Sequence, residues 1–214
     1  QAIKENNILK MYVDENVLNF MGSREYESTI MANETIEATV MFIDLCGFTK
    51  ISETAPADTV VAMINTYFDE MVKEIMAQQG FIDKFIGDAI MAVFRGDYHL
   101  DRAIDAALAV RHKINNLAKP ENLEDFIPKV SIGIKSGEMI SGNIGSASLK
   151  RLDYTVIGDT VNTAARFQDA AKADQIIISE ACYNQVKEAF KCKKIGDIEL
   201  KNKAEKITVY EVLE

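Results

Sequence analysis

Two aspartates interrupt stretches of sequence that otherwise have the apolar character of buried β-strands. Asp44 lies near the end of the apolar run 40–45, and Asp88 lies between the apolar runs 81–86 and 89–94. Burying a lone carboxylate costs far more free energy than the burial of its apolar neighbours recovers. Two such carboxylates therefore predict that a positive charge lies between them. A divalent metal ion with oxygen ligands is the simplest candidate.

The composition is that of a globular protein and excludes several classes of function. The 214 residues are 48% hydrophobic and 27% charged, enough for one large or two small domains with a substantial core. The formal net charge of −9 argues against nucleic-acid binding, since affinity for phosphates comes mostly from clustered Lys and Arg. The three cysteines form no CxxC pair, which indicates neither a disulfide framework nor a zinc site.

The cysteine usage favours a reducing, cytoplasmic setting, and the sequence shows no membrane or secretion signal. No apolar run approaches the roughly 18 residues that a membrane-spanning helix needs, and there is no signal peptide. The chain opens at Gln1 without Met. We therefore treat it as a domain that an upstream sensor or membrane segment could precede.

The order of the predicted elements indicates an α+β fold. Alternating and helical hydrophobic periods define the elements of the first two thirds of the chain. They are strand 37–45, a helix from Pro56 to Gly80, strands 81–86 and 89–94, a helix over 99–118 and strand 129–135. This βαββαβ order is typical of a ferredoxin-like core, with helices packed on one face of a mostly antiparallel sheet.

Extra strands and helices are predicted after this core, and a separate segment before it. The later elements are a Gly-rich hairpin around Gly137, Gly142 and Gly145, strand 153–157, a helix over about 159–171, strand 175–178, a short helix from Ser179, and two last strands ending at Val212. Residues 7–22 are predicted to form a partner-facing helix, followed by a loop over 23–36. We thus expect an N-terminal helix and linker over 1–36 and one domain over 37–214.

The two aspartates come together if strand 37–45 lies beside the hairpin 81–94. Gly87 and Asp88 separate the two strands of that hairpin, a pattern typical of a tight turn in which Gly supplies positive φ. Two carboxylates on adjacent strands repel each other unless cations lie between them, so the pairing predicts metal binding. The structural alternative is that one aspartate caps a helix and the other is an ordinary turn residue.

Four further features suggest contacts with a charged ligand, and each has a structural alternative. The turn Gly47-Phe48-Thr49 offers backbone N–H groups for phosphate oxygens, or simply enters a helix. Asn162 and Arg166 share one face of a predicted helix. They either contact a ligand or form an ordinary solvated polar face. Lys84 lies within an apolar strand. It either contacts a ligand or is an edge-strand lysine that opposes aggregation. Lys203 lies in a stretch that also reads as a charged turn.

Three long motifs resemble those of the class III nucleotidyl cyclase catalytic domain. They are Phe42-Ile43-Asp44-Leu45-Cys46-Gly47-Phe48-Thr49, Lys84-Phe85-Ile86-Gly87-Asp88, and Tyr154-Thr155-Val156-Ile157-Gly158-Asp159-Thr160-Val161-Asn162-Thr163-Ala164-Ala165-Arg166. The resemblance covers about residues 37–212 and implies a cyclase catalytic domain there. Members of that family convert a nucleoside triphosphate to its 3′,5′-cyclic monophosphate and pyrophosphate, using two divalent metal ions, Mg²⁺ or Mn²⁺.

The resemblance implies a role for each motif residue. Asp44 and Asp88 would bind both metal ions, helped by the backbone carbonyl of Leu45. Asn162 would orient the ribose, and Arg166 would stabilise charge on the α-phosphate in the transition state.

The base-reading positions of the family favour ATP as the substrate. Lys84 and Thr155 occupy them, where guanylyl cyclases usually carry Glu and Cys, and adenine N1 accepts a hydrogen bond from a lysine. Lys with Thr is the pattern of a mainly bacterial subgroup, some of whose members respond to bicarbonate. Lys203 matches the late lysine that binds the triphosphate. These matches imply an adenylyl cyclase.

The family architecture also implies a homodimer with active sites at its interface, in which the metal aspartates of one protomer face Lys84, Thr155, Asn162, Arg166 and Lys203 of the other. The helix 7–22 would then carry input from an upstream sensor. The alternatives are a guanylyl cyclase and a catalytically silent dimerisation or nucleotide-binding module. A domain of the diguanylate-cyclase or polymerase-palm type shares the sheet order, but the diguanylate type needs a Gly-Gly-Asp/Glu-Glu-Phe-like hairpin that is absent here.

Overall fold

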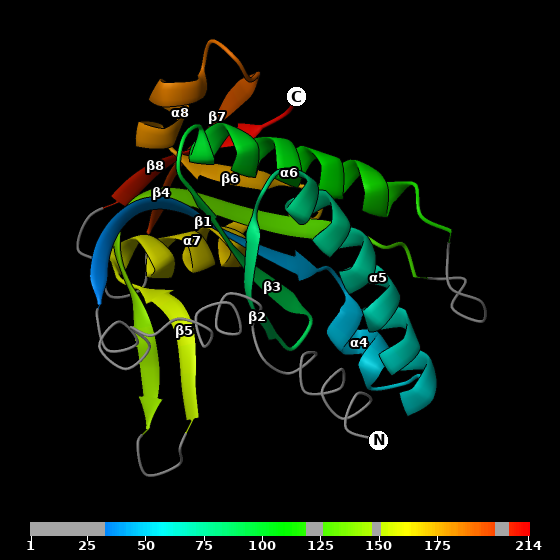
Figure 1. The fold of residues 1–214 in the computed structure, drawn as a ribbon. Coiled ribbons are helices and arrows are strands. Elements are labelled where there is room, and N and C mark those ends of the chain that lie inside the picture. Colours follow the sequence, from blue (N-terminus) through cyan, green and yellow to red (C-terminus); the bar gives the residue numbers. More distant parts are fainter. Residues whose placement is uncertain (1–32, 119–125, 147–150, 200–205) are drawn as a thin grey trace. The chain divides into compact units, whose positions relative to one another are not determined.

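The structure, a computed structural model, describes residues 33–118, 126–146, 151–199 and 206–214 (Figure 1). They belong to two compact units, one formed by residues 37–139 and 157–214 and the other by residues up to 36 together with 140–156. The predicted helix 7–22 and Lys203 lie outside the described residues. None of the helices in the described ranges is long and apolar enough to cross a membrane.

The order of strands and helices follows the predicted order closely. The strands are β1 (Glu34–Leu45), β2 (Phe81–Ile86), β3 (Ala89–Arg95), β4 (Val130–Ser146), β5 (Arg151–Ile157), β6 (Ile176–Ser179), β7 (Cys192–Glu199) and β8 (Lys206–Val212). The helices in the described part of the chain are α4 (Phe48–Ser52), α5 (Ala57–Ala77), α6 (His99–Asn115), α7 (Asp159–Ala170) and α8 (Glu180–Val186).

The strand order confirms the α+β, ferredoxin-like prediction. The sheet runs β2-β3-β1-β4-β6-β8-β7, and β5 pairs with β4 beside this path. Its first four strands have the order expected of a βαββαβ core. β1 pairs antiparallel with β3, and β4 pairs parallel with β6. The additional strands β6, β7 and β8 extend the sheet on the β4 side, as the extra C-terminal elements of the prediction require.

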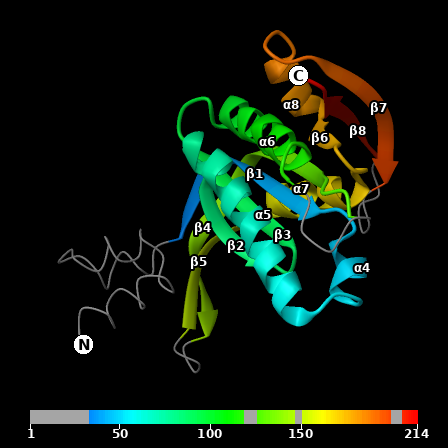
Figure 2. The same cartoon turned by 90° about the vertical axis from the view of Figure 1, so that its right-hand side faces the viewer.

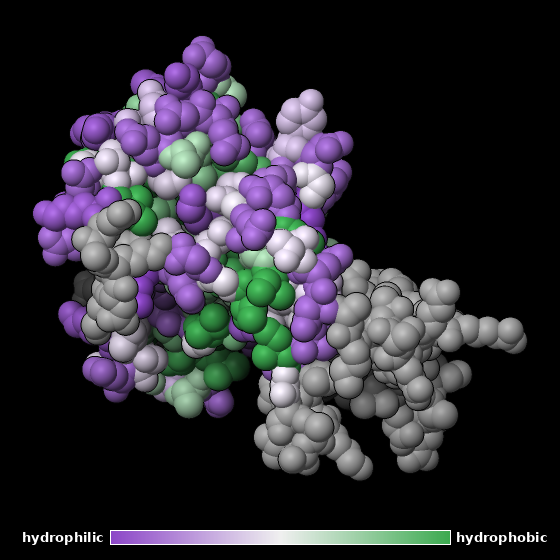
Figure 3. All heavy atoms as spheres, turned by 90° about the vertical axis from the view of Figure 1, so that its left-hand side faces the viewer, coloured by the Kyte–Doolittle hydropathy of each residue, from purple (hydrophilic) through white to green (hydrophobic). Residues whose placement is uncertain are grey.

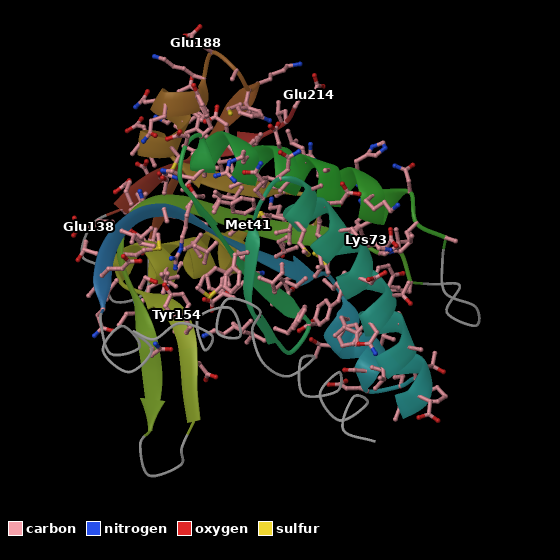
Figure 4. All side chains as sticks on the ribbon, viewed as in Figure 1. Met41, Lys73, Glu138, Tyr154, Glu188 and Glu214 are labelled. Carbon is pink, nitrogen blue, oxygen red and sulfur yellow. The ribbon has the colours of Figure 1, made fainter. Side chains whose placement is uncertain are left out.

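One face of the sheet is covered by α5 and α6, which lie side by side (Figure 2). Alternate residues of β1, namely Met41, Ile43 and Leu45, point into this core, and Met41 is labelled in Figure 4. The helices contribute apolar residues at intervals of three and four, as amphipathic helices do. These are Met63, Tyr67, Met71 and Ile75 of α5 and Leu100, Ala103, Ile104, Ala107, Val110 and Ile114 of α6.

The opposite face of the sheet carries α7 and a second, smaller core. Phe167 of α7 packs against Ile177 of β6 and Val209 of β8. The flanking residues Ile176 and Ile178 point into the α5–α6 core instead, because side chains alternate between the faces of a strand. Helices therefore cover both faces of the extended sheet, whereas the two helices of the ferredoxin-like core share one face.

The predicted hairpin around Gly137, Gly142 and Gly145 is wrong. β4 continues through these glycines to Ser146, and the chain returns only at β5. The glycines make room for neighbours in an extended strand: a side chain at Gly137 would contact Thr160, and one at Gly142 would collide with Asn33. The turn at Gly47 enters the short helix α4, which agrees with the structural alternative given for this turn, although the first helix was predicted only from Pro56.

Hydrophobic side chains also reach the surface. On the face shown in Figure 3 they gather as a patch within a largely hydrophilic surface. Over the described residues as a whole, and not on that face alone, the exposed large hydrophobic residues include Val61 of α5 and Phe85 and Ile86 of β2. Phe85 stacks on Phe68 of α5, with the ring centroids 4.7 Å apart.

Arg102 of α6 ties together the ends of three elements. Its guanidinium donates hydrogen bonds to the backbone carbonyls of Gln78 (3.1 Å) and Gln79 (3.3 Å) after α5, of Asp97 before α6 (3.1 Å), and of Arg95 at the end of β3. Arginine suits this position because its planar fork has five donors in fixed directions.

We expect Arg102→Met to lower the free energy of unfolding by about 2–3 kcal/mol, because the partly buried carbonyls of Gln78 and Arg95 and the exposed carbonyls of Gln79 and Asp97 lose their donor at once. Urea unfolding followed by circular dichroism measures this. Lys73→Met is the control: Lys73, labelled in Figure 4, is exposed and forms ion pairs only with Asp69 and Glu70 on its own helix among the described contacts. Its unfolding midpoint should stay within experimental error, and an equal loss in both variants would contradict the role of Arg102.

Candidate active site

The structure brings Asp44 and Asp88 to the same end of neighbouring strands. In the antiparallel pairing of β1 with β3, Asp44 lies opposite Ala89, and Asp88 is the residue before Ala89. The turn that carries Asp88 is the predicted tight one, and Gly87 has the expected positive φ of 62°. The placement follows from backbone register and turn geometry, so neither carboxylate depends on a long flexible loop.

The electrostatics of this end of the sheet favour a cation. Partial burial, followed by the negative charges of Asp88 and Asp169, raises the pKa of Asp44 to about 6. Desolvation and like charges both oppose ionisation of a carboxyl group. A bound cation would offset both effects, since its positive charge favours the ionised carboxylates.

The available ligands are hard oxygen atoms, which fit Mg²⁺ or Mn²⁺. No group of three or more His, Cys, Asp or Glu side chains within the described ranges is arranged to hold a metal ion. A metal here would therefore need ligands besides the two carboxylates. Leu45 is 1% exposed as a whole residue, and its side chain lies in the core. Metal binding by its backbone carbonyl, which the resemblance implies, stays a prediction.

Asp44 points to the α7 face of the sheet. Its neighbours Ile43 and Leu45 point into the α5–α6 core, and side chains alternate along a strand. Asp169, which acts on Asp44, belongs to α7. Asp44, the candidate metal ligand, and α7 therefore lie on the same face of the sheet within one protomer.

The turn after the aspartate leads directly into α4. Gly47 has φ 80° and precedes Phe48, the first residue of the helix. The ring of Phe48 is buried in the main core, whereas Gly47 and Thr49 on either side are exposed. No side chain caps this helix start. Phosphate binding by the backbone of Gly47, Phe48 and Thr49 stays a prediction.

Lys84 has a neighbour that the sequence analysis did not identify. Its Nζ lies 3.1 Å from Oδ2 of Asp83, whose side chain is only 1% exposed. The pairing of β2 with β3 shifts register between Ile82 and Lys84, so a bulge lets two consecutive side chains interact. The sequence offered one signal for this contact, namely an acidic residue next to a lysine in an apolar strand. In a regular strand, however, consecutive side chains point to opposite faces, which would separate Asp83 from Lys84.

Asn162 and Arg166 lie one turn apart on α7, as predicted, with Asn162 exposed and Arg166 half-buried. The helix rests directly on β4 at Gly133. A Cβ atom added there would lie 2.2 Å from the backbone N of Gln168 and 2.3 Å from the backbone O of Ala164. Only glycine permits this approach, so Gly133 sets the depth at which the helix carrying Asn162 and Arg166 lies.

Thr155 belongs to the other compact unit. It lies on β5 and is 6% exposed. Next to it, the hydroxyl of Ser141 on β4 donates a hydrogen bond of 2.9 Å to the hydroxyl of Tyr154, which Figure 4 labels. Lys84 and Thr155 belong to different compact units, and their role as a base-reading pair stays a prediction.

Residues 30–213 match the family described as the adenylate and guanylate cyclase catalytic domain. The chain belongs to this family. The fold and the acid pair agree with the class III cyclase resemblance of the sequence motifs.

Members of the cyclase family with both nucleotide specificities are similar to this chain. An adenylate cyclase of Anabaena cylindrica is 36% identical over 191 residues, which are 85% of this chain and 38% of that protein. The crystal structure of the adenylyl cyclase CyaB from P. aeruginosa matches with a TM-score of 0.75 and 30% identity, over 86% of this chain and 97% of that one. The guanylate cyclase domain of RhGC from Catenaria anguillulae, in complex with GTP, matches with a TM-score of 0.76 and 28% identity, over 84% and 98%.

The chain spans between about a quarter and two fifths of the length of the curated relatives it matches. The comparison therefore concerns the cyclase domain of those proteins.

The raised pKa of Asp44 predicts how the stability of the metal-free domain depends on pH. Its pKa is about 6 in the folded state and 3.8 as the unperturbed value. The folded protein thus holds this proton more tightly than the unfolded chain, and the stabilisation from protonation is lost as pH rises from about 4 through 6.

Asp44→Asn should remove this loss and leave the domain about 1–1.5 kcal/mol more stable than the wild type at pH 7.5. This value is smaller than the full pKa shift would give, because solvent screens a half-exposed group. Urea unfolding in EDTA at pH 4.5 and 7.5 measures it. Asp97→Asn, an exposed loop residue, is the control. An equal gain at both pH values would contradict the assignment.

Proposed function

We propose that this chain is the catalytic domain of an adenylyl cyclase that converts ATP to 3′,5′-cyclic AMP and pyrophosphate at sites shared across a homodimer. The observation that carries the proposal is the pair of Asp44 and Asp88, held together by the β1–β3 register. Family membership supports cyclase chemistry, and Lys84 supports adenine as the base.

The reaction joins two atoms of one substrate. The ribose 3′-oxygen bonds to the α-phosphorus, the bond from the α-phosphorus to the oxygen bridging to the β-phosphate breaks, and the 3′-hydroxyl proton passes to solvent. Two divalent ions bound by Asp44, Asp88 and the carbonyl of Leu45 would supply activation of the hydroxyl and neutralisation of the leaving pyrophosphate. The remaining work of the protein is positioning and electrostatic stabilisation.

Adenine recognition falls to Lys84 and Thr155. The ammonium group of Lys84 has three donors, so it can keep its contact with Asp83 (3.1 Å) and still donate to adenine N1. Guanine presents N–H groups at the same edge and calls for an acceptor such as Glu. The buried carboxylate of Asp83 supports the proposal because it holds the lysine in place for the base.

Arg166 and Asn162 would act on the reacting end of the substrate. The Arg166 guanidinium is always charged and suits the charge that develops on the α-phosphate. Asn162, one turn earlier on the same helix, would orient the ribose. Lys203 would contact the triphosphate, and the N–H groups of the turn from Gly47 to Thr49 would hold phosphate oxygens.

A homodimer is the proposed active form, in which Asp44 and Asp88 of one protomer face the Lys84, Thr155, Asn162, Arg166 and Lys203 set of the other. Exposed apolar side chains next to the acid pair support a partner at this place: Phe85 is 52% and Ile86 48% exposed, directly before the Gly87–Asp88 turn. Contiguous exposed apolar surface is typical of protein interfaces.

The product from ATP and from GTP tests this function. With Mn²⁺ or Mg²⁺ the chain should form cyclic AMP, at a specific rate that rises with protein concentration as dimers assemble. Asp88→Ala should abolish turnover, and Lys84→Glu with Thr155→Cys should move preference towards GTP. Cyclic GMP from the wild type would favour a guanylyl cyclase. Nucleotide binding or dimerisation without any product would favour a silent module.

Mixed dimers test the shared site. Asp44→Ala and Arg166→Ala proteins should each be inactive, but co-expression of the two should restore about a quarter of wild-type activity, because half of the dimers are mixed and each of these has one intact site of two. The measurement is cyclic AMP production by the unselected mixture of dimers. Mixed dimers purified through two different tags, one on each variant, should reach about half of wild-type activity, because each has one intact site of two. Mixed dimers without activity would show that each protomer holds a complete site.

A further inference from the structure

A short chain of hydrogen bonds connects α7 to the end of β1 through β4. Gln168 of α7 donates from Nε2 to the hydroxyl of Ser131, at 3.1 Å. The hydroxyl of Ser131 lies next to the thiol of Cys46, to which it can donate a hydrogen bond. Ser131 is 4% exposed. Its hydroxyl can accept from one neighbour and donate to the other, which makes it a two-sided connector.

Backbone contacts keep both ends of this chain of bonds in place. The N–H of Cys46 donates to the carbonyl of Lys129 at 2.9 Å, which ties the end of β1 to the residue before β4. Gly133, two residues after Ser131, is the point where the backbone of α7 rests on β4. The side chain of Ser131 thus bridges two backbones that already lie at close range.

The two ends of the link lie next to the two halves of the catalytic machinery. Cys46 is two residues after Asp44, and Gln168 is two residues after Arg166. Under the proposed shared sites, on which this inference rests, the Asp44 and the Arg166 of one protomer serve different active sites of the dimer. A contact that joins them within the protomer therefore joins the two active sites.

We propose that Ser131 is a positioning residue that holds the Asp44 end of β1 and the Arg166 helix in a fixed relation, and so couples the two active sites of the homodimer. It touches neither substrate nor metal. Its effect comes through geometry, because displacements well below 1 Å of groups that stabilise a transition state lower the rate substantially. Alanine at this position would leave the Gln168 amide and the Cys46 thiol without their shared partner.

The first test separates positioning from stability. In the homodimer, Ser131→Ala should lower kcat about 5–20-fold with KM for ATP changed less than about 2-fold, measured well below the unfolding temperature. Ser136→Ala is the matched control, since Ser136 is a buried serine of the same strand whose recorded hydrogen bond, to the Cys182 sulfur, uses its backbone N–H. An equal loss in both variants, or a loss matched by the unfolded fraction, would overturn the proposal.

Gln168→Ala provides a second route that does not change the strand. It should lower kcat to a similar extent, and the double variant with Ser131→Ala should lose no more than the worse single variant, since both changes break the same link. Losses that multiply would mean that the two residues act independently, which would overturn the link. Should Ser131→Ala fail to fold, Gln168→Ala carries the test alone.

The decisive test uses mixed dimers with one working site, made from Asp44→Ala and Arg166→Ala protomers. Ser131→Ala is added either to the protomer that supplies Asp44 or to the one that supplies Arg166. A coupling link predicts a loss of about 3–10-fold in both arrangements, because each working half is held by its own protomer's link. A loss in one arrangement only, or in neither, would overturn the coupling.

The parent mixed dimer, made from Asp44→Ala and Arg166→Ala protomers without a change at Ser131, distinguishes failure of the shared site from failure of the Ser131 link. If the parent pair is active and Ser131→Ala has no effect, the shared site stands and the link fails. If the wild type is active and the parent pair, shown to dimerise, is inactive, the shared site fails and the coupling fails with it.

Discussion

The repulsion between Asp44 and Asp88 is the constraint around which the rest of the domain is arranged. The β1–β3 register and the Gly87 turn hold both carboxylates at one end of the sheet, where burial and like charge raise the pKa of Asp44 to about 6. The ionised Asp44 carboxylate therefore opposes folding when no cation is bound. The large apolar core beneath α5 and α6 offsets that opposition, and the proposed metal ions would turn it into an affinity for cations.

Much of this arrangement could be predicted from the sequence because it depends on local signals. Helical periodicity located α5 and α6, and the Gly87–Asp88 turn between two apolar runs brought Asp88 beside Asp44 once the sheet order was assumed. The features that were missed depend on long-range packing. The bulge that brings the side chains of Asp83 and Lys84 together breaks the alternation on which the prediction relied. The glycines of β4 allow neighbouring groups to approach the strand closely, whereas a run of glycines in a sequence usually indicates a turn.

The candidate site could be predicted residue by residue only through motifs. From spacing alone, Asn162 and Arg166 share a helix face and nothing more. The contacts that position α7 come from distant parts of the chain: Gly133 and Ser131 on β4, with Ser131 also reaching Cys46 after β1. No periodicity marks a buried serine as a connector, since small polar residues occur on strands for many reasons.

The main core and the candidate site lie on opposite faces of the sheet. Met41, Ile43 and Leu45 of β1 fill the α5–α6 core, whereas Asp44 faces the side where α7 packs. A strand that alternates in this way can carry a costly carboxylate without opening a hole in the main core, because its neighbours are buried on the other face. The same alternation puts Ser131 and Gly133 of β4 on the α7 side. The groups that hold α7 and the carboxylate that would hold the metal thus share one face of the sheet.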